Sequence, residues 1–303
     1  MSKQDFVDLT DYQPQVLKEI INRSMELKSG APPRRGKDKA LAMIFTKPST
    51  RTNVSFRMAM HRLGGTSMYL GQETLQLSRG ETMGDTAKTL SRYVDVIMIR
   101  TFSHQDVIDL AAGASAPVIN GLTDLLHPCQ AMGDVLTLTE EKGDNYENLK
   151  MAYLGDGNNV CHSLINAAGL FGFELTISAP EQFAPDDKVL KPMQKRNPGI
   201  VVEPDPVAAV ENADALYTDV WVSMGDEEEE ELRRSTFEPY QVNNELLSHA
   251  KDDAIVLHCL PANRGEELTD EVMDGPQSRV FDQAENRMHS QQAILEYLLG
   301  TVD

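Results

Sequence analysis

The sequence predicts an α/β protein of two doubly wound parallel-sheet domains joined by two interdomain helices. Apolar runs alternate with segments of helical periodicity along all 303 residues, and these runs fall into two sets separated by a helical segment. A chain of this length accommodates two domains of ordinary size. We place the first domain at residues 1–135 plus 286–303 and the second at residues 136–285.

Each predicted strand is a short continuous apolar run, as expected when helices cover both faces of a parallel sheet. In the first domain the runs are residues 40–45, 67–70, 94–99 and 117–119. In the second they are residues 150–154, 174–178, 200–202, 213–217 and 254–258. The helix after the first run carries apolar residues at spacings that suit packing on the sheet, namely Val54, Phe56, Met58, Ala59 and Leu63.

Two further helices are predicted to join the domains. One covers residues 127–141, where Pro128 suits the first turn and a polar stretch follows the last turn. The other covers about residues 284–299, and we expect it to pack back across the first domain through Ala293, Ile294, Tyr297 and Leu298.

Composition excludes some classes of partner and predicts the cellular compartment. The net charge of −19 repels nucleic acid and anionic lipid, so we expect neither as a partner. No run is long enough to span a membrane and no signal peptide is evident, which predicts a cytoplasmic protein. Cys129, Cys161 and Cys259 are an odd number without CxxC spacing, which argues against a disulfide framework or a structural zinc site.

Residues 45–52 have the composition of an anion site. They connect the end of a predicted strand to the start of a helix, where unpaired N–H groups and the positive end of the helix dipole favour an anion. Ser49, Thr50 and Thr52 add hydroxyl groups, and Arg51 adds a guanidinium that can hold two phosphate oxygens. Helix capping explains one hydroxyl but not three around an arginine, so we favour a phosphate site.

Other polar residues also follow the ends of predicted strands, which is the edge where ligands bind in open parallel sheets. They are Arg100, His127, Asn158, Asn159, Asp219, His258 and Cys259. A buried Arg100 needs an anionic partner, for which phosphate is suitable. Two sheets with their carboxyl edges facing one crevice would bring both sets of residues together.

Histidine and cysteine each allow two interpretations. His127 and Gln130 stand three residues apart on one helix face, where they suit polarisation of a carbonyl oxygen. A capping histidine with a water-facing glutamine is an equally good interpretation. For Cys259 alone, an inert buried thiol is favoured over a nucleophile.

The loop at residues 155–159 resembles a dinucleotide loop only superficially. Val160 stands where the third glycine of G-x-G-x-x-G belongs, and the next strand ends at Ser178 instead of an acidic residue. We interpret the two asparagines as ligand-binding groups, with helix capping by Asn158 as the alternative. Asp219, at a strand end, suits an ammonium group, and the segment up to Gly225 suits either a loop that orders over substrate or an ordinary surface loop.

Together these segments resemble the transcarbamylase family over nearly the whole chain. The family's carbamoyl phosphate signature corresponds to Ser-Thr-Arg-Thr at residues 49–52, and its second signature to His-Pro-Cys-Gln at residues 127–130, with Arg100 between them. Asp219 with Ser-Met-Gly at residues 223–225, and His-Cys-Leu-Pro at residues 258–261 with Arg264, resemble the ornithine-specific branch of the biosynthetic type.

The resemblance implies a reaction and a set of binding residues. Carbamoyl transfer to the side-chain amine of L-ornithine would give L-citrulline and phosphate in arginine biosynthesis, without a cofactor or metal ion. Catalytic roles are implied for Arg51, Arg100, His127 and Cys259. Carbamoyl phosphate would be bound by Ser49, Thr50, Arg51, Thr52, Gln76, Arg100, His127, Gln130, Cys259, Leu260 and Arg287. L-ornithine would be bound by Asn159, Asp219, Ser223 and Met224.

The resemblance also implies a homo-oligomer, because Gln76 would reach in from a neighbouring subunit. A trimer or a multiple of trimers is therefore expected. Carbamoyl transfer to putrescine or aspartate is one alternative function. Another is a nucleotide-binding oxidoreductase or a regulatory binding protein built on the Gly155 loop, which predicts stabilisation by NAD(P).

Overall fold

The structure is a computed structural model that describes residues 3–75, 80–222 and 227–301. The chain forms two compact units, which are unit 1 (Met1–Gly133 and Arg287–Asp303) and unit 2 (Asp134–Asn286). Both boundaries between the units fall inside helices, namely α5 (Pro128–Lys142) and α12 (Val280–Leu299). Within the described ranges, no helix combines the length and the apolar character that crossing a bilayer requires.

Unit 1 contains a parallel sheet with the strand order β2-β1-β3-β4. The strands are β1 (Ala40–Phe45), β2 (Thr66–Gly71), β3 (Val96–Arg100) and β4 (Val118–Leu122). Phe45 at the end of β1 pairs with Gly71 of β2 and with Arg100 of β3, so the carboxyl ends of these strands are level. β1 and β3 are buried on both faces, which explains their continuous apolar sequences.

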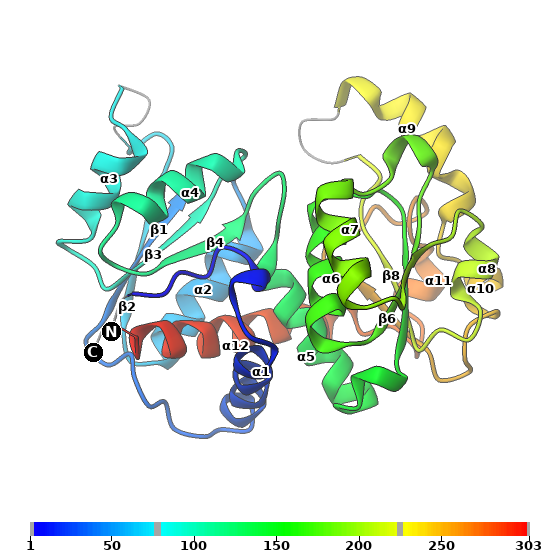
Figure 1. Cartoon of the computed structure of the whole chain (residues 1–303), viewed down its shortest axis with the longest axis horizontal. Coiled ribbons are helices and arrows are strands. Elements are labelled where there is room, and N and C mark those ends of the chain that lie inside the picture. Colours follow the sequence, from blue (N-terminus) through cyan, green and yellow to red (C-terminus); the bar gives the residue numbers. More distant parts are fainter. Residues whose placement is uncertain (1–2, 76–79, 223–226, 302–303) are drawn as a thin grey trace. The chain divides into compact units, whose positions relative to one another are not determined.

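Helices cover both faces of this sheet, as a doubly wound fold requires (Figure 1). One face of the sheet packs through Ile44 and Ile97 against Val107 and Leu110 in the core. The helices of the unit are α1 (Pro14–Lys28), α2 (Thr50–Arg62), α3 (Met83–Leu90), α4 (His104–Gly113), and the parts of α5 and α12 assigned to it. A short 3₁₀ helix covers Leu9–Asp11.

The face that α2 turns inward differs from the sequence prediction. Phe56, Ala59 and Leu63 are buried as expected, but Val54 and Met58 are 54% and 39% exposed. Residues 54 and 58 are four apart and share a side of the helix that the buried residues do not occupy. The apolar spacing was correct for a helix but did not reveal that α2 has an outward apolar stripe.

Unit 2 contains a second parallel sheet with the order β7-β6-β5-β8-β9. The strands are β5 (Lys150–Leu154), β6 (Glu174–Ser178), β7 (Ile200–Val202), β8 (Ala215–Thr218) and β9 (Ile255–His258). Leu154 pairs with Thr218, and Thr218 pairs with His258, so three loops leave the same edge beside one another. Both sheets confirm the predicted strands with shifts at their ends.

In unit 2, α6 (Asn159–Phe171) and α7 (Asp187–Arg196) lie on one face of the sheet, and α8 (Pro206–Val210), α10 (Asn244–Leu247) and α11 (Asp270–Met273) on the other (Figure 1). The second face is apolar, with Leu216 and Val256 packed against Leu246 and Val272. Helix α9 (Glu230–Phe237) follows a 3₁₀ turn at Glu227–Glu229. Further 3₁₀ turns are Tyr146–Asn148, Glu181–Phe183 and Glu238–Tyr240.

Helices α5 and α12 contact each other closely in both units. In unit 2, Gln283 Nε2 donates to Asp134 Oδ1 at 2.6 Å, and Asn286 Nδ2 donates to Thr137 Oγ1 at 3.0 Å. In unit 1, a β-carbon added to Gly133 would lie 2.9 Å from Arg287 Cγ and 3.3 Å from its Cα and N. A glycine is therefore needed where the two helices meet. The predicted helix at 284–299 starts four residues earlier, at Val280, and its Ile294 and Leu298 are buried in unit 1 as expected.

We predict that Gly133→Ala lowers the free energy of unfolding by about 1–3 kcal/mol, because the new methyl group meets the backbone of α12. Gly84→Ala on α3 is the control, since the nearest atom to its added β-carbon would be Thr82 Oγ1, at 3.9 Å. Urea unfolding of both variants measures the difference. Equal stability of the two variants would contradict the close helix contact.

Candidate active site

Unit 1 gathers hydroxyl groups at the start of α2. Ser49 Oγ accepts a hydrogen bond from the N–H of Thr52 at 3.3 Å and donates to Thr52 Oγ1 at 3.2 Å, so Ser49 is the N-cap residue. Thr52 is fully buried, Arg51 is half-buried, and Thr50 is exposed as the first helical residue. Capping accounts for Ser49, and the two threonines and Arg51 surround the same helix start.

Two arginines bring positive charge to this edge of unit 1. Arg287 of α12 is 5% exposed and its Nη2 donates to Thr52 Oγ1 at 3.1 Å. Arg100 is 7% exposed, and its carbonyl accepts from the N–H groups of Thr46 at 3.0 Å and Lys47 at 3.4 Å. The end of β3 thus fixes the chain between β1 and α2. We call the group of Arg100, Arg287, His127 and Thr52 the cationic cluster, after its two arginines.

His127 lies immediately before α5 and is buried together with Gln130. The pKa of His127 is held well below its ordinary value, first by burial and then by the positive charges of Arg287, Arg100 and Lys47. The imidazole is therefore neutral, and its ring faces three cations. Because Gln130 is buried, the interpretation in which it faces water is wrong.

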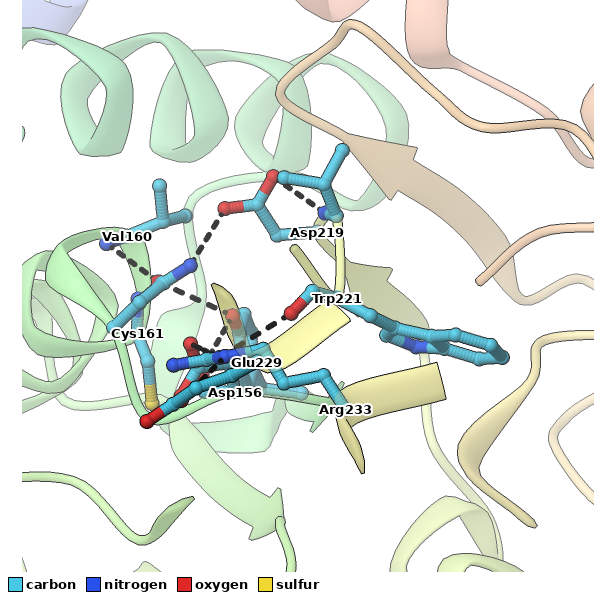
Figure 2. A network of polar contacts seen from close by, with 10 residues as sticks. Asp156, Val160, Cys161, Asp219, Trp221, Glu229 and Arg233 are labelled. Carbon is cyan, nitrogen blue, oxygen red and sulfur yellow. Dashed lines mark hydrogen bonds and ion pairs between the residues drawn. The ribbon is translucent and has the colours of Figure 1, made fainter. Parts of the chain in front are cut away.

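Unit 2 gathers polar groups around Asp219, directly after β8. Asp219 Oδ2 accepts from Asn158 Nδ2 at 2.8 Å, and Oδ1 accepts from the N–H of Val220 at 2.9 Å (Figure 2). The thiol of Cys259, after β9, donates to Oδ1 at 2.9 Å. Asn158, Asp219 and Cys259 form what we call the Asp219 cluster. Asn159 is the first residue of α6, next to this cluster in the chain.

Asn158 also caps α6. Its Oδ1 accepts from the N–H groups of Val160 at 2.9 Å and Cys161 at 3.2 Å. These are the amides that a bound pyrophosphate would use at a helix start. The alternative interpretation, in which Asn158 caps a helix, is therefore confirmed. Its amide nitrogen also donates a hydrogen bond to the Asp219 carboxylate.

The turn after β9 is fixed by two buried side chains. His258 Nδ1 accepts from the N–H of Leu260 at 2.8 Å, so Nε2 carries the ring proton and donates to Glu267 Oε1 at 2.9 Å. Leu260 has φ of +60°, a conformation that few non-glycine residues adopt. These contacts hold Cys259 next to Asp219. Cys259 is half-buried and its thiol is hydrogen-bonded to a carboxylate, so the expected full burial of this thiol is wrong.

The other two cysteines fit that expectation better. Both are fully buried, and burial raises the pKa of the Cys129 thiol to about 12 and that of Cys161 well above its ordinary value. None of the three cysteines is in a disulfide. Asp219, His258 and Cys259 each offer a metal-ligand atom, and these atoms lie within 4.8 Å of one another. Both nitrogens of His258 and the Cys259 proton are engaged with protein partners, so an ion would have to displace these bonds.

Some predicted site residues lie outside the described part of the chain. These are Gln76, Ser223 and Met224. Sequence reasoning assigned no role to Lys47, whose charge acts on His127. The signal for Lys47 was its position inside the segment at residues 45–52. Asn158 was interpreted from the residues as a ligand-binding group, although the family resemblance did not include it among the ornithine-binding residues.

Comparison with known proteins finds two family domains, one in each half of the chain, and the second match extends into the part of α12 that belongs to unit 1. Residues 4–140 match the carbamoyl-P binding domain of aspartate/ornithine carbamoyltransferase, and residues 147–298 match its Asp/Orn binding domain. The fold and the two polar clusters define a two-unit α/β protein with buried arginines at the edge of one sheet and a carboxylate at the edge of the other. The chain belongs to the aspartate/ornithine carbamoyltransferase family.

Its relatives match over their full lengths. The chain is 51% identical to an ornithine carbamoyltransferase of Pyrococcus horikoshii over 306 residues, which cover 98% of this chain and 96% of that protein. It is 49% identical to an anabolic ornithine carbamoyltransferase of Pyrococcus furiosus over 100% of this chain and 98% of that protein. The solved ornithine carbamoyltransferase structure from P. furiosus superposes with a TM-score of 0.94 over 99% of this chain and 98% of that chain.

The neutral His127 predicts a specific dependence of stability on pH. Below about pH 6.5 this histidine is protonated in the unfolded chain but not in the folded chain. The free energy of unfolding therefore decreases as the pH is lowered, by up to about 1.4 kcal/mol per pH unit. Above that pH the residue is neutral in both states and contributes no slope.

We therefore expect urea unfolding between pH 7.5 and 5 to show a shallower loss of stability in His127→Gln than in the wild type. His249→Gln, which changes an exposed histidine, is the control and keeps the wild-type slope. Parallel curves for the wild type and His127→Gln would show that His127 is protonated in the folded chain.

Proposed function

We propose that this chain transfers the carbamoyl group of carbamoyl phosphate to the side-chain amine of L-ornithine, giving L-citrulline and phosphate. The observation that carries the proposal is the cationic cluster, in which buried Arg287 bonds Thr52 at the start of α2 in a chain of net charge −19. Such a concentration of scarce positive charge suits a phosphate. The names of its full-length relatives support the same reaction.

Unit 1 is the carbamoyl phosphate-binding half in this proposal. The phosphate is bound by the helix start and the arginines, through Ser49, Thr50, Arg51, Thr52, Arg100 and Arg287. His127 and Gln130 contact the carbamoyl group. Because burial keeps His127 neutral, its imidazole donates a hydrogen bond to the carbonyl oxygen without giving up a full proton, and the surrounding cations stabilise the charge that grows there.

Unit 2 is the ornithine-binding half. Asp219 binds the α-ammonium group, with Asn159, Ser223 and Met224 as further contacts. Cys259 and the Leu260 backbone help to hold the reacting amine and also adjoin carbamoyl phosphate. The hydrogen bonds from Asn158 and Cys259 keep the Asp219 carboxylate oriented, which supports its role as an anchor and not as a base.

The chemical step is a displacement at the carbamoyl carbon. The neutral side-chain nitrogen of ornithine forms the new C–N bond, and the bond from carbon to the phosphate oxygen breaks. The nitrogen loses one proton, and the released phosphate takes it up as hydrogen phosphate. Phosphate is a good leaving group, so the protein contributes orientation and charge stabilisation, chiefly through Arg51, Arg100 and His127.

We further propose a trimer or a multiple of trimers that acts in arginine biosynthesis in the cytoplasm, with Gln76 supplied by a neighbouring subunit. The outward apolar residues Val54 and Met58 of α2, with Met68 and Tyr69 of the edge strand β2, support a subunit contact. The odd number of cysteines without CxxC spacing supports a compartment in which thiols stay reduced.

The alternatives are less well supported. Putrescine has no α-ammonium group for the Asp219 cluster, and aspartate would require cationic side chains there. A nucleotide-binding function of the Gly155 loop is disfavoured because Asn158 occupies the amides at the start of α6.

One assay tests the proposal. Purified protein is given carbamoyl phosphate with ornithine, putrescine or aspartate in turn, and the ureido product is measured colorimetrically. We expect product with ornithine. Product with another amine only, or none with ornithine, would refute the proposed function.

We predict that Arg51→Ala lowers kcat/KM by a factor on the order of 100 to 1,000 and weakens carbamoyl phosphate binding, because a grip on the phosphate is lost. Arg57→Ala, an exposed arginine of the same helix, is the matched control and leaves both unchanged. Isothermal titration with carbamoyl phosphate measures the affinity. An unchanged affinity in Arg51→Ala refutes the assignment.

Asp219→Asn is expected to raise the KM for ornithine roughly 10- to 100-fold, because the α-ammonium group loses one charge-assisted hydrogen bond. The KM for carbamoyl phosphate stays within about twofold. Steady-state kinetics with each substrate varied in turn separates the two, and Asp253→Asn, which removes an exposed carboxylate, is the control. An effect confined to carbamoyl phosphate would count against the role.

A further inference from the structure

Arg233 of α9 is a buried cation that binds two separate loops of unit 2 (Figure 2). Its Nη1 donates to Asp156 Oδ2 at 2.8 Å and to the carbonyl of Trp221 at 3.2 Å. Asp156 follows β5 and Trp221 follows β8, and these two strands are neighbours in the sheet. One guanidinium therefore connects the loops at the carboxyl ends of adjacent strands.

These two loops carry the proposed ornithine-binding residues. Asn159 stands three residues after Asp156, and Asp219 stands two residues before Trp221. The loops also meet directly, where Asn158 Nδ2 donates to Asp219 Oδ2. The hydroxyl of Tyr153, a residue of β5, donates to the carbonyl of Asp156 at 2.8 Å and so fixes the loop that follows β5. The Arg233 contacts are thus a second connection between the segments that present Asn159 and Asp219.

The surroundings of Arg233 make this connection rigid. The side chains of Arg233 and Asp156 are only 9% and 13% exposed, and the guanidinium lies 4.6 Å from the centre of the Phe183 ring. Glu229 Oε2 accepts from Arg233 Nε at 3.2 Å on the solvent side. Removing Arg233 takes a buried counter-ion away from Asp156, so we expect the two loops to rearrange, whereas removing the charge of Asp156 leaves Arg233 paired with Glu229.

An apolar cluster that does not include Arg233 also holds α9. Trp221, Phe237 and Tyr240 form an apolar cluster that anchors the helix, with the rings of Trp221 and Phe237 stacked at 6.2 Å. The contacts special to Arg233 are those to Asp156 and the Trp221 carbonyl. Its contact with the Phe183 ring belongs to the packing around α9, and the two polar contacts belong to the loops.

We propose that Arg233 is a positioning residue of the ornithine site, acting through Asp156 and Trp221 to set the spacing between Asn159 and Asp219. This inference rests on the proposed function. Arg233 does not contact the substrate itself. Its loss changes the recognition of ornithine and leaves the binding of carbamoyl phosphate as it was.

The test compares Arg233→Met with Arg234→Met. Arg234 is the matched control because it neighbours Arg233 on α9, is 46% exposed and pairs with Glu230 and Glu266. We expect Arg233→Met to raise the KM for ornithine by about tenfold or more, with the KM for carbamoyl phosphate within about twofold. Arg234→Met keeps both values within about twofold of the wild type. Arg233→Lys, which retains the charge but one nitrogen only, recovers part of the loss.

Asp156→Asn gives a second approach, because it keeps the shape of the side chain and removes its charge. It is expected to raise the KM for ornithine. In the double variant with Arg233→Met, the combined effect on this KM is smaller than the sum of the two single effects on a free-energy scale. Should Arg233→Met fail to fold, Asp156→Asn and Arg233→Lys decide the question.

The outcomes separate the two proposals. A wild type that forms no citrulline refutes the proposed function. An active wild type with the same ornithine KM in Arg233→Met, Asp156→Asn and Arg234→Met overturns the positioning role alone. Equal increases in both KM values would also overturn it, because they would indicate general loss of structure.

Discussion

Burial of positive charge at the edge of the first sheet is the constraint on which unit 1 depends. Arg100 and Arg287 are nearly inaccessible to solvent, and a buried guanidinium is costly unless hydrogen bonds and an anion compensate it. Thr52, at the positive end of α2, accepts from Arg287. Burial first, and these charges second, lower the pKa of His127 and keep it neutral. Each group therefore depends on the others, and the cluster is prepared for a ligand that carries negative charge.

Unit 2 has the opposite electrostatic character around Asp219. Three donors converge on one carboxylate, from the Asn158 amide, the Val220 N–H and the Cys259 thiol. Neutral donors fix the carboxylate without cancelling its charge, so it remains able to bind an ammonium group. The polarity of each unit thus suits one of the two proposed substrates, a phosphate for unit 1 and an amino acid with free ammonium groups for unit 2.

Side chains that never touch a substrate shape both sites. The pair of His258 and Glu267 fixes the turn that presents Cys259, and Gly133 lets α12 approach α5 closely enough for Arg287 to reach Thr52. The contacts of Arg233 belong to the same class. In each case a buried contact between separate elements sets the position of a functional group. A change in the size or charge of the contacting side chain would therefore move that group.

The sequence by itself determined the fold class, the strands and the residues at their carboxyl ends. Strands buried on both faces are continuous apolar runs, and the polar residue that ends a run is conspicuous, as with Arg100 and Asp219. The family motifs predicted which residues form the site. Only the tertiary structure decided that Val54 and Met58 face outward, that Cys259 bonds Asp219 and that Arg233 bridges two loops. These facts depend on contacts between residues up to 77 positions apart, which local periodicity does not encode.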